Sequence, residues 1–237
     1  MSIRVALLED DQDQGLLMKA WLEEAGYRCF HYATAKELQR ALQRDSYDIL
    51  ILDWVLPESS GIEVLKWVRR QLDWRIPTIF ITGRDADEDV VYALEQGADD
   101  YMAKPVSKGV VTARVRAMER RAFGDKAEKT VFQFGEFDID PSAGVVKRNG
   151  EAVTLTDREV KLAVLLFTNL GRLLSRDYLL ENVWGINPDV VTRTVDTHVS
   201  RLRQKLELYP EKGWQLKAVY QHGYRLEQIA PEPETDG

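Results

Sequence analysis

The sequence has very little of the residue types that build disulfide frameworks or transition-metal sites. Cysteine occurs once, at Cys29, which excludes an internal disulfide and fits a reducing compartment. The three histidines, His31, His198 and His222, lie far apart and show neither zinc-type spacing nor an H-E-x-x-H pattern. We therefore expect no transition-metal site built from protein ligands alone.

Long apolar runs are also missing. No run approaches the roughly 18 residues that a membrane-spanning helix needs, and the N-terminal residues show no signal-peptide pattern. We therefore expect a cytoplasmic protein without membrane contact. The net charge of −7 argues weakly against nucleic-acid binding, because basic residues can still be concentrated on one element.

The pattern of the chain changes near residue 123, and the length of 237 residues allows two domains. Residues 1–122 alternate apolar runs with helical periodicity, and the small, charged stretch 123–130 predicts a linker. Residues 131–229 predict a second domain of α+β type. The acidic segment 230–237 predicts a disordered tail.

In the first domain, five apolar runs read as strands: IRVALL, RCFHY, DILIL, PTIFIT and DDYMA. A segment of helical periodicity follows each run. In the first of these segments Leu17, Trp21, Leu22 and Ala25 share one face, and Gly26 is placed to end the helix. Strands that alternate with helices predict an α/β doubly wound parallel five-stranded sheet.

The second domain begins with short antiparallel strands, for which Asn149-Gly150 is the hairpin signal. Three helices follow, and the first opens with a capping box formed by Thr156 and Glu159. Two last strands surround a turn at 221–223. Three helices followed by a hairpin are typical of a winged helix.

Polar side chains stand where the strands of the predicted parallel sheet end. They are Glu9, Asp10 and Asp11 after the first strand, Asp53 after the third, Thr82 after the fourth and Lys104 after the fifth. Because the carboxyl ends of parallel strands meet at one rim, at least three carboxylates would crowd together and repel one another. Oxygen ligands without sulfur or imidazole favour Mg²⁺. Asp11 reads as a solvated neighbour of the cluster.

These residues and their spacing resemble the receiver domain of bacterial two-component response regulators, which has a flavodoxin-like fold. The resemblance covers roughly residues 3–122. It consists of Glu9-Asp10, Asp53 in D-W-V-L-P-x-x-x-G, Thr82-Gly83, and Tyr101 ahead of Lys104-Pro105, a peptide bond that is cis in the family.

The resemblance implies that Asp53 accepts a phosphoryl group from a sensor histidine kinase. It also implies that Mg²⁺ (or Mn²⁺) is held by Glu9, Asp10, Asp53 and the main-chain carbonyl of Val55. Thr82 and Lys104 would contact the phosphoryl group, and Tyr101 would turn inward as a switch.

Within the response regulators, the OmpR/PhoB subfamily implies a homodimer formed through the fourth helix, fifth strand and fifth helix of the receiver. Its charged set is matched here by Glu95, Asp99, Asp100, Arg114 and Arg121. The sequence departs from the family at Val90 and Val110, where a basic residue and its acidic partner usually stand. Apolar groups often replace an ion pair without loss of stability, so we expect a dimer that depends more on apolar contact and less on phosphate.

Residues 130–228 resemble the winged-helix domain of the same subfamily, in LTDREVKLAVLL, LSRDYLLENVWG, TRTVDTHVSRLRQKLE and GYRL. The resemblance implies binding of double-stranded promoter DNA through a net-basic third helix whose buried stripe is Val195, Val199, Leu202 and Leu206. The candidate contacts are Arg193, Thr197, His198, Arg201, Arg203, Tyr220 and Arg225. Family members often have arginine in the wing where Tyr220 stands, so arginine reading of the minor groove is not expected. By analogy, the loop 185–191 is a candidate contact for RNA polymerase.

The sequence thus predicts a phosphorylation-dependent transcriptional regulator of a two-component system, and not an enzyme. A first alternative is a regulator of the same architecture that binds DNA without phosphate. A second is an aspartyl-phosphate phosphatase of the haloacid dehalogenase type. That type has a second acid two residues after the nucleophile, where this chain has Val55.

Overall fold

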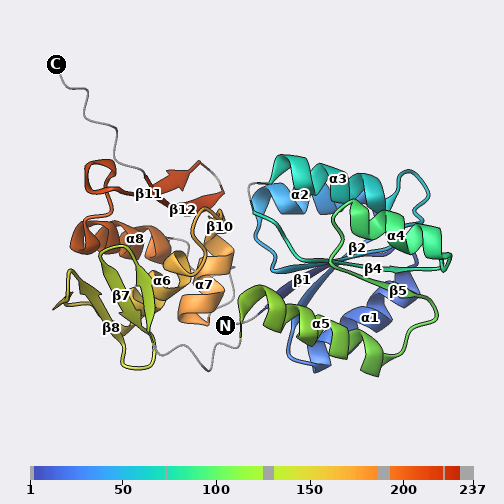
Figure 1. Ribbon diagram of the computed structural model, residues 1–237, viewed down its shortest axis with the longest axis horizontal. Coiled ribbons are helices and arrows are strands. Elements are labelled where there is room, and N and C mark those ends of the chain that lie inside the picture. Colours follow the sequence, from blue (N-terminus) through green and yellow to red (C-terminus); the bar gives the residue numbers. More distant parts are fainter. Residues whose placement is uncertain (1–2, 73, 125–130, 186–192, 221, 230–237) are drawn as a thin grey trace, which may run out of the picture. The chain divides into compact units, whose positions relative to one another are not determined.

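A computed structural model describes residues 3–72, 74–124, 131–185, 193–220 and 222–229 (Figure 1). The chain divides into two compact units, Met1–Asp125 and Lys126–Gly237, each with its own sheets and core. Among the described residues, no helix combines the length and the apolar character that crossing a membrane requires.

The first unit is a parallel sheet of five strands in the order β2-β1-β3-β4-β5. Its strands are β1 (Arg4–Leu8), β2 (Arg28–Tyr32), β3 (Ile49–Leu52), β4 (Thr78–Thr82) and β5 (Asp100–Ala103). Its helices are α1 (Gln12–Glu24), α2 (Ala35–Arg44), α3 (Gly61–Gln71), α4 (Asp87–Glu95) and α5 (Lys108–Phe123). Strand and helix alternate along the whole unit, as the sequence predicted.

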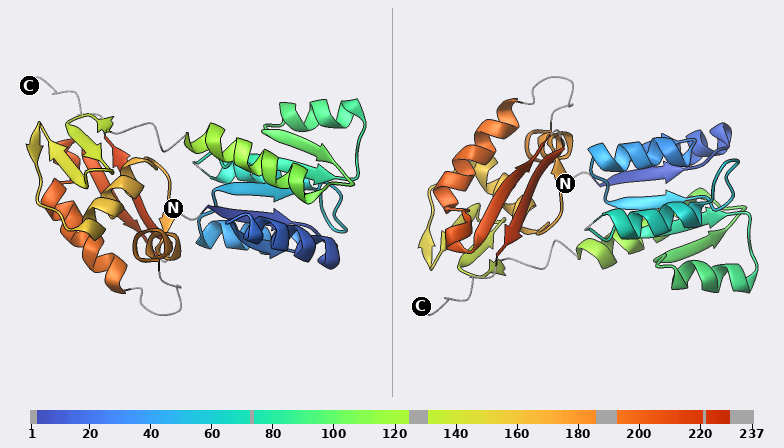
Figure 2. Two further views of the ribbon diagram at one scale, coloured as in Figure 1. Left: turned by 90° about the horizontal axis from the view of Figure 1, so that it is seen from below. Right: turned by 90° about the horizontal axis from the view of Figure 1, so that it is seen from above.

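Helices cover both faces of this sheet, with α1 and α5 on one side and α2, α3 and α4 on the other (Figure 1 and Figure 2). Side chains alternate along each strand, so every strand supplies two separate cores. In β1, Val5 and Leu7 pack with α1 and α5, whereas Ala6 and Leu8 pack with α2 and α3. The sheet is therefore rigidly held from both faces, and its carboxyl edge is the fixed frame of the site below.

The buried face of α1 matches the predicted one only in part. Met18 and Leu22 are buried, but Leu17 is 50% exposed, and Trp21 is only half-buried. The expected helix end is correct, because Gly26 adopts a φ of +94°, which a residue with a side chain rarely adopts. Packing against the sheet, rather than the count of apolar residues, decided which face turned inward.

The second unit contains two antiparallel sheets and three helices. One sheet joins β6 (Phe132–Phe134), β7 (Phe137–Asp140), β8 (Val145–Arg148) and β9 (Glu151–Ala152). The other joins β10 (Leu174–Ser175), β12 (Gly223–Gln228) and β11 (Trp214–Val219), in that order. The helices are α6 (Asp157–Phe167), α7 (Arg176–Trp184) and α8 (Arg193–Leu206), and a short 3-10 turn, η1 (Pro210–Lys212), precedes β11.

Local signals in the second unit act as the sequence predicted. Asn149 and Gly150 both have positive φ, as a tight hairpin turn requires. Thr156 and Glu159 form the capping box of α6. The core of the unit closes on the rings of Phe137, Phe167 and Trp214, with centroids 5.0 to 5.6 Å apart. The arrangement is a winged helix with an N-terminal sheet.

Candidate metal centre and nucleic-acid interface

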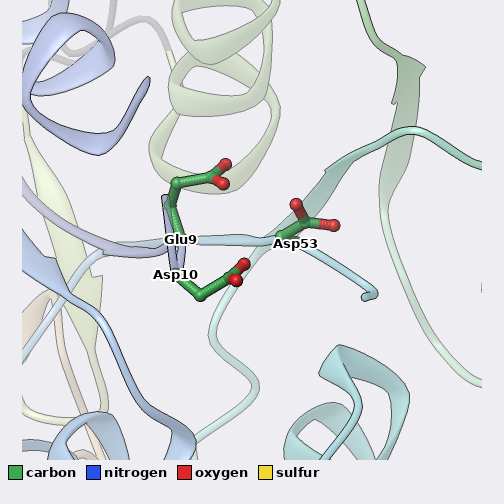
Figure 3. Close-up of side chains that lie close together, drawn as sticks. All are labelled: Glu9, Asp10 and Asp53. Carbon is green, nitrogen blue, oxygen red and sulfur yellow. The ribbon is translucent and has the colours of Figure 1, made fainter. Parts of the chain in front are cut away.

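Three carboxylates meet at the carboxyl edge of the parallel sheet. Glu9 and Asp10 follow β1 and Asp53 follows β3, strands that pair directly with each other. One oxygen from each carboxylate lies within 4.8 Å of the other two, and Figure 3 shows the three side chains close together. Glu9 and Asp53 are buried, at 1% and 6% exposure, whereas Asp10 is more accessible.

Lys104 lies between two of these carboxylates. Its Nζ donates to Glu9 Oε2 and to Asp53 Oδ2, both at 2.7 Å. Burial raises the pKa of Glu9, and the bond from Lys104 offsets this only in part. Burial lowers the pKa of Lys104, but its bonds to Asp53 and Glu9 outweigh that effect and leave the pKa raised. The two shifts have different causes: burial dominates at Glu9, whereas the two carboxylates hold the proton on Lys104.

The donor set fits a hard divalent cation. All three side chains offer oxygen, and within the described ranges no sulfur or imidazole joins the cluster. Lys104 already supplies one positive charge to two buried carboxylates, so a further cation would relieve the remaining repulsion. The acidic cluster is therefore consistent with a metal site.

The backbone around Asp53 is held from several sides. Its N–H donates to Leu8 O at 2.9 Å, and its Oδ1 accepts from Val55 N at 3.0 Å. A Cβ on Gly61 would lie 2.1 Å from Asp53 O, so only glycine leaves room for this approach. Gly61 N in turn donates to Trp54 O at 2.9 Å, which closes the turn after the acid. The motif D-W-V-L-P-x-x-x-G therefore ends in glycine because a side chain at Gly61 would clash with the main-chain carbonyl of Asp53.

Thr82 and Tyr101 belong to the same edge. Thr82 is fully buried, and its carbonyl accepts from Lys104 N at 2.8 Å. Tyr101 is 9% exposed and stacks on Phe80 at 6.2 Å, and its hydroxyl donates to Arg84 O at 2.9 Å. The Lys104-Pro105 peptide bond is cis, as the resemblance implied.

Trp54 is a residue whose role the sequence did not reveal. Its ring lies under the guanidinium of Arg84, with 4.9 Å between Cζ and the ring centroid, and Arg84 also bonds Asp89 at 2.8 Å. The same ring lies 6.0 Å from that of Tyr92 on α4. The only signal in the sequence for this role was an aromatic residue directly after Asp53. Through its contacts with Arg84 and Tyr92, Trp54 connects the neighbourhood of Asp53 to the β4–α4 segment.

The residues predicted for the dimer face lie on α4, β5 and α5. Glu95 and Arg121 are exposed, and Val110 is 47% exposed, whereas Val90 is half-buried against the core beneath α4. Val91, Tyr92 and Leu94 are instead the large hydrophobic residues that α4 exposes.

The other charges of this set are engaged within the chain. Asp100 pairs with Arg114 at 2.9 Å, and Asp99 bonds Arg75 at 3.1 Å and Thr78 N at 2.9 Å.

Helix α8 buries the stripe that the sequence predicted: Val195, Val199, Leu202 and Leu206. Thr197 and Arg201 are exposed on the helix. Arg203 Nε donates to Leu216 O at 2.8 Å, and Lys205 Nζ donates to Glu159 Oε2 at 2.7 Å, so both of these basic residues make tertiary bonds.

Two further DNA candidates on α8 are placed differently. His198 Nδ1 bonds the Thr194 carbonyl of its own helix at 2.8 Å, and its ring meets Trp184 edge-on at 5.0 Å. The side chain of Arg193 lies outside the described part of the structure.

Asp196 joins α8 to its neighbours, a role that the sequence did not reveal. Its Oδ1 accepts from Arg176 Nε at 3.0 Å and from the Tyr224 hydroxyl at 2.6 Å. Arg176 lies over the Tyr224 ring at 5.0 Å. Burial and the bond to Asp196 raise the pKa of Tyr224 to about 12, so the hydroxyl remains a donor at neutral pH. Helix α8, the start of α7 and strand β12 are thus joined through the carboxylate of Asp196.

The hairpin of β11 and β12 presents Tyr220, which is 83% exposed, at its turn. Arg225 is half-buried and pairs with Glu227 at 3.4 Å. The loop proposed for RNA polymerase falls, apart from Gly185, outside the described residues. So do most of the predicted linker and all of the predicted tail.

Comparisons with known proteins match both units. The model of the family described as "Response regulator receiver domain" matches residues 5–116, and that described as "Transcriptional regulatory protein, C terminal" matches residues 150–226. The chain is 37% identical over 226 residues to the transcriptional regulatory protein VxrB of Vibrio cholerae, covering 93% of this chain and 86% of that protein.

A second relative is the phosphate regulon transcriptional regulatory protein PhoB of Rhizobium meliloti. It is 36% identical over 225 residues, covering 94% of this chain and 98% of PhoB. Among solved structures, a signal receiver domain named for a Luxo repressor protein of Vibrio parahaemolyticus aligns with a TM-score of 0.50 and 28% identity. That alignment covers 54% of this chain and 99% of that domain.

Proposed function

Because the chain belongs to the OmpR/PhoB family of two-component response regulators, which are phosphoacceptor transcription factors rather than enzymes, we propose that Asp53 accepts the phosphoryl group. The observation that carries the proposal is the position of Asp53. It ends β3 inside an acidic cluster, 2.7 Å from the ammonium of Lys104.

The chemistry follows from these contacts. A carboxylate is already an anionic nucleophile, so an Asp53 oxygen attacks the phosphorus of a phosphohistidine without a general base. The P–O bond forms as the P–N bond breaks, and the electron pair leaves with the imidazole of the kinase. Lys104 is compact and mobile enough to pair with a phosphoryl oxygen, and phosphoryl transfer needs mainly such positioning and neutralisation.

The metal of this proposal is Mg²⁺ or Mn²⁺, held by Glu9, Asp10, Asp53 and the main-chain carbonyl of Val55. A bound divalent ion would neutralise part of the negative charge on the carboxylates and on the incoming phosphate. The proposal is supported by the oxygen-only donor set and by the raised pKa of Glu9, which burial causes.

Thr82 and Tyr101 would couple the phosphoryl group to the α4–β5 face. A hydrogen bond from the Thr82 hydroxyl to a phosphoryl oxygen favours the arrangement in which Tyr101 is turned inward. The α4–β5–α5 face would then form a homodimer, with Glu95, Asp99, Asp100, Arg114 and Arg121 as its charged set. Val110, with Val90 at its margin, would add apolar contact. Sedimentation of the unphosphorylated protein tests this dimer, and a clean monomer at tens of micromolar contradicts it.

The second unit would bind double-stranded promoter DNA through α8 and the hairpin. Thr197 and Arg201 are the best-supported contacts because both are exposed on α8. Arg193, His198, Arg203, Tyr220 and Arg225 complete the proposed set, with RNA polymerase as a further partner. The partner that supplies phosphate is a sensor histidine kinase, and the place of action is the cytoplasm, where the DNA is.

A second candidate is regulation without phosphate. It is favoured by Val110, which is 47% exposed on α5 where the family usually has an acidic residue, because apolar contact can form a dimer without phosphate. In that case the active arrangement would be the resting one.

Intact-mass measurement after treatment with acetyl phosphate and Mg²⁺ tests the role of Asp53. The wild-type protein should gain the mass of one phosphoryl group, and Asp53→Ala should not. Glu58→Ala, which removes an exposed acid of the β3–α3 turn, is the matched control and should still gain it. No added mass on the wild type overturns the proposal.

DNA affinity separates the two candidates. We expect phosphodonor and Mg²⁺ to tighten DNA binding by the wild type and to leave binding by Asp53→Ala unchanged. Equal affinities for both proteins, with and without phosphodonor, would favour the second candidate.

A further inference from the structure

His31 contacts the acidic loop from the neighbouring strand. The ring nitrogen Nε2 lies 2.8 Å from the main-chain carbonyl oxygen of Glu9. A carbonyl oxygen can only accept, so Nε2 carries the hydrogen. The N–H of Glu9 donates to Tyr32 O at 3.1 Å. Consecutive residues at the end of β2 therefore hold both backbone polar groups of Glu9.

Gly15 on α1 provides the space that the ring occupies. A Cβ added at Gly15 would lie 2.2 Å from His31 Nε2 and 2.3 Å from Cε1. Side-chain atoms do not approach this closely, so the imidazole and the bare glycine backbone are complementary in shape. Gly15 lies in the first turns of α1 and is itself buried.

The loop between β1 and α1 is thus fixed at both ends. Asp11 caps α1 by accepting from the N–H groups of Asp13 and Gln14, both at 3.0 Å. Glu9 and Asp10 lie between this cap and His31. The carbonyl of Glu9 and the N–H of Asp10 belong to one planar peptide group, so the direction of that carbonyl also sets the start of Asp10.

We propose that His31 is a positioning residue for the carboxylates of Glu9 and Asp10, and that Gly15 is glycine so that His31 can reach the loop. His31 touches no ligand atom and acts through the peptide group that carries both carboxylates. The inference rests on the proposed metal-dependent function of that cluster. It adds two residues that neither the motifs of the sequence nor the acidic cluster identified.

Calorimetric titration of Mg²⁺ into the full-length, unphosphorylated protein is the test. Partners that orient metal ligands typically change affinity by about 10–100-fold when removed, so His31→Leu should weaken Mg²⁺ binding by about 10-fold or more. His31→Gln places an amide N–H near the position of Nε2 and should keep the affinity within about 3-fold of wild type.

His222→Leu is the matched control. His222 Nδ1 bonds a main-chain carbonyl, that of Tyr220, at 2.6 Å, but it lies in the second unit, so its removal should leave Mg²⁺ affinity unchanged. Melting temperatures without metal separate loss of fold from loss of positioning. The inference is overturned if His31→Leu binds Mg²⁺ like wild type, or if His31→Gln, still folded, binds as weakly as His31→Leu.

Substitution of Gly15 provides a second, independent test of the proposal. Gly15→Ala should displace the ring and weaken Mg²⁺ binding in the wild-type background, and unchanged binding would overturn the proposal. In the His31→Ala background the same change should cause no further loss and should raise the melting temperature, because alanine favours helix over glycine. A wild-type protein that binds no Mg²⁺ overturns both this inference and the metal site. Normal wild-type binding with an unaffected His31→Leu overturns this inference alone.

Discussion

Glu9 in the first unit and Glu159 in the second are alike in their exposure to solvent and in their hydrogen bond to a lysine. They are 1% and 2% exposed, and each accepts a hydrogen bond from a lysine ammonium at 2.7 Å. Their pKa values nevertheless move in opposite directions. Burial raises the pKa of both, but only at Glu159 do the bonds from Lys205 and Thr156 outweigh it and leave the pKa lowered.

Burial is the largest influence on both carboxylates, and the two sites differ in the bonds that oppose it. Lys104 divides its ammonium between Glu9 and Asp53, whereas Lys205 serves Glu159, which also accepts from the N–H and hydroxyl of Thr156. A fully paired carboxylate completes a helix cap and stabilises the fold. An under-neutralised one is costly to bury, and such a cost is typical of a site that binds a cation.

The largest effect should come from Lys104→Met. Removing one partner of a buried ion pair leaves uncompensated charge, so we expect the first unit to lose about 3 kcal/mol of unfolding free energy without divalent ions. Hydrogen exchange of amides in β1 and β3 measures this. Mg²⁺ should restore part of the loss, because it binds the folded state. Lys205→Met is the control, and a Mg²⁺ response there would break the comparison.

Glu159→Gln should destabilise the second unit by about 2 kcal/mol at neutral pH, because it replaces the charge-assisted hydrogen bond from Lys205 with a neutral one, although the amide oxygen can still close the capping box. The lowered pKa means that this stability is present above the ordinary value of 4.5 and is lost as the pH falls through the folded-state value. The difference between variant and wild type should therefore shrink in acid, as followed by hydrogen exchange in α6. A difference that grows below pH 4.5 would contradict the assignment.

The same distinction separates the basic residues of α8. Arg201 is exposed, whereas Lys205 is bonded to Glu159. Arg201→Ala should weaken DNA binding by about 1–3 kcal/mol if the arginine reads a base, without changing the melting temperature. Lys205→Ala should instead lower the melting temperature of the second unit. Fluorescence anisotropy with promoter DNA and thermal unfolding measure the two effects, and an exchange of roles would contradict the distinction.

The smallest expected effect has the opposite sign. Glu9→Gln removes an under-neutralised charge, so without metal the first unit should gain about 1 kcal/mol of unfolding free energy. The same variant should bind Mg²⁺ at least about 10-fold more weakly, a loss of about 1.4 kcal/mol. Hydrogen exchange and calorimetry measure the two quantities. If Glu9→Gln destabilises its unit as Glu159→Gln does, the two carboxylates have the same function after all.

Local patterns explain what the sequence predicted well. The capping box of Thr156 and Glu159 is a four-residue signal, and its geometry needs no distant partner. The gathering of Glu9, Asp53 and Lys104 was predictable because parallel strands deliver their ends to one edge. In both cases the geometry of the chain predicts which residues meet, so the contacting partners need not be known in advance.

Contacts between distant residues were out of reach. The bond that Lys205 makes to Glu159 spans 46 positions and that from Arg203 to Leu216 spans 13. The sequence therefore could not show that Arg203, a predicted DNA contact, and Lys205, counted in the positive charge of the helix, make bonds within the unit. On α1 the sequence placed Leu17 inward, whereas Met18 packs in the core and Leu17 is 50% exposed. Nothing in the spacing of His31 pointed to Gly15.

Asp196 gives the second unit a property of its own. One oxygen of Asp196 accepts hydrogen bonds from Arg176 of α7 and from Tyr224 of β12. These bonds hold helix α8 and the β11–β12 hairpin at a set spacing. In the proposed DNA complex, the protein would then set the distance between the groove contact of α8 and the backbone contact of the hairpin, and the helical phase of the duplex would have to match it. An operator lengthened by one base pair between those two contacts would have to be overwound or bent to fit, at an elastic cost to the DNA.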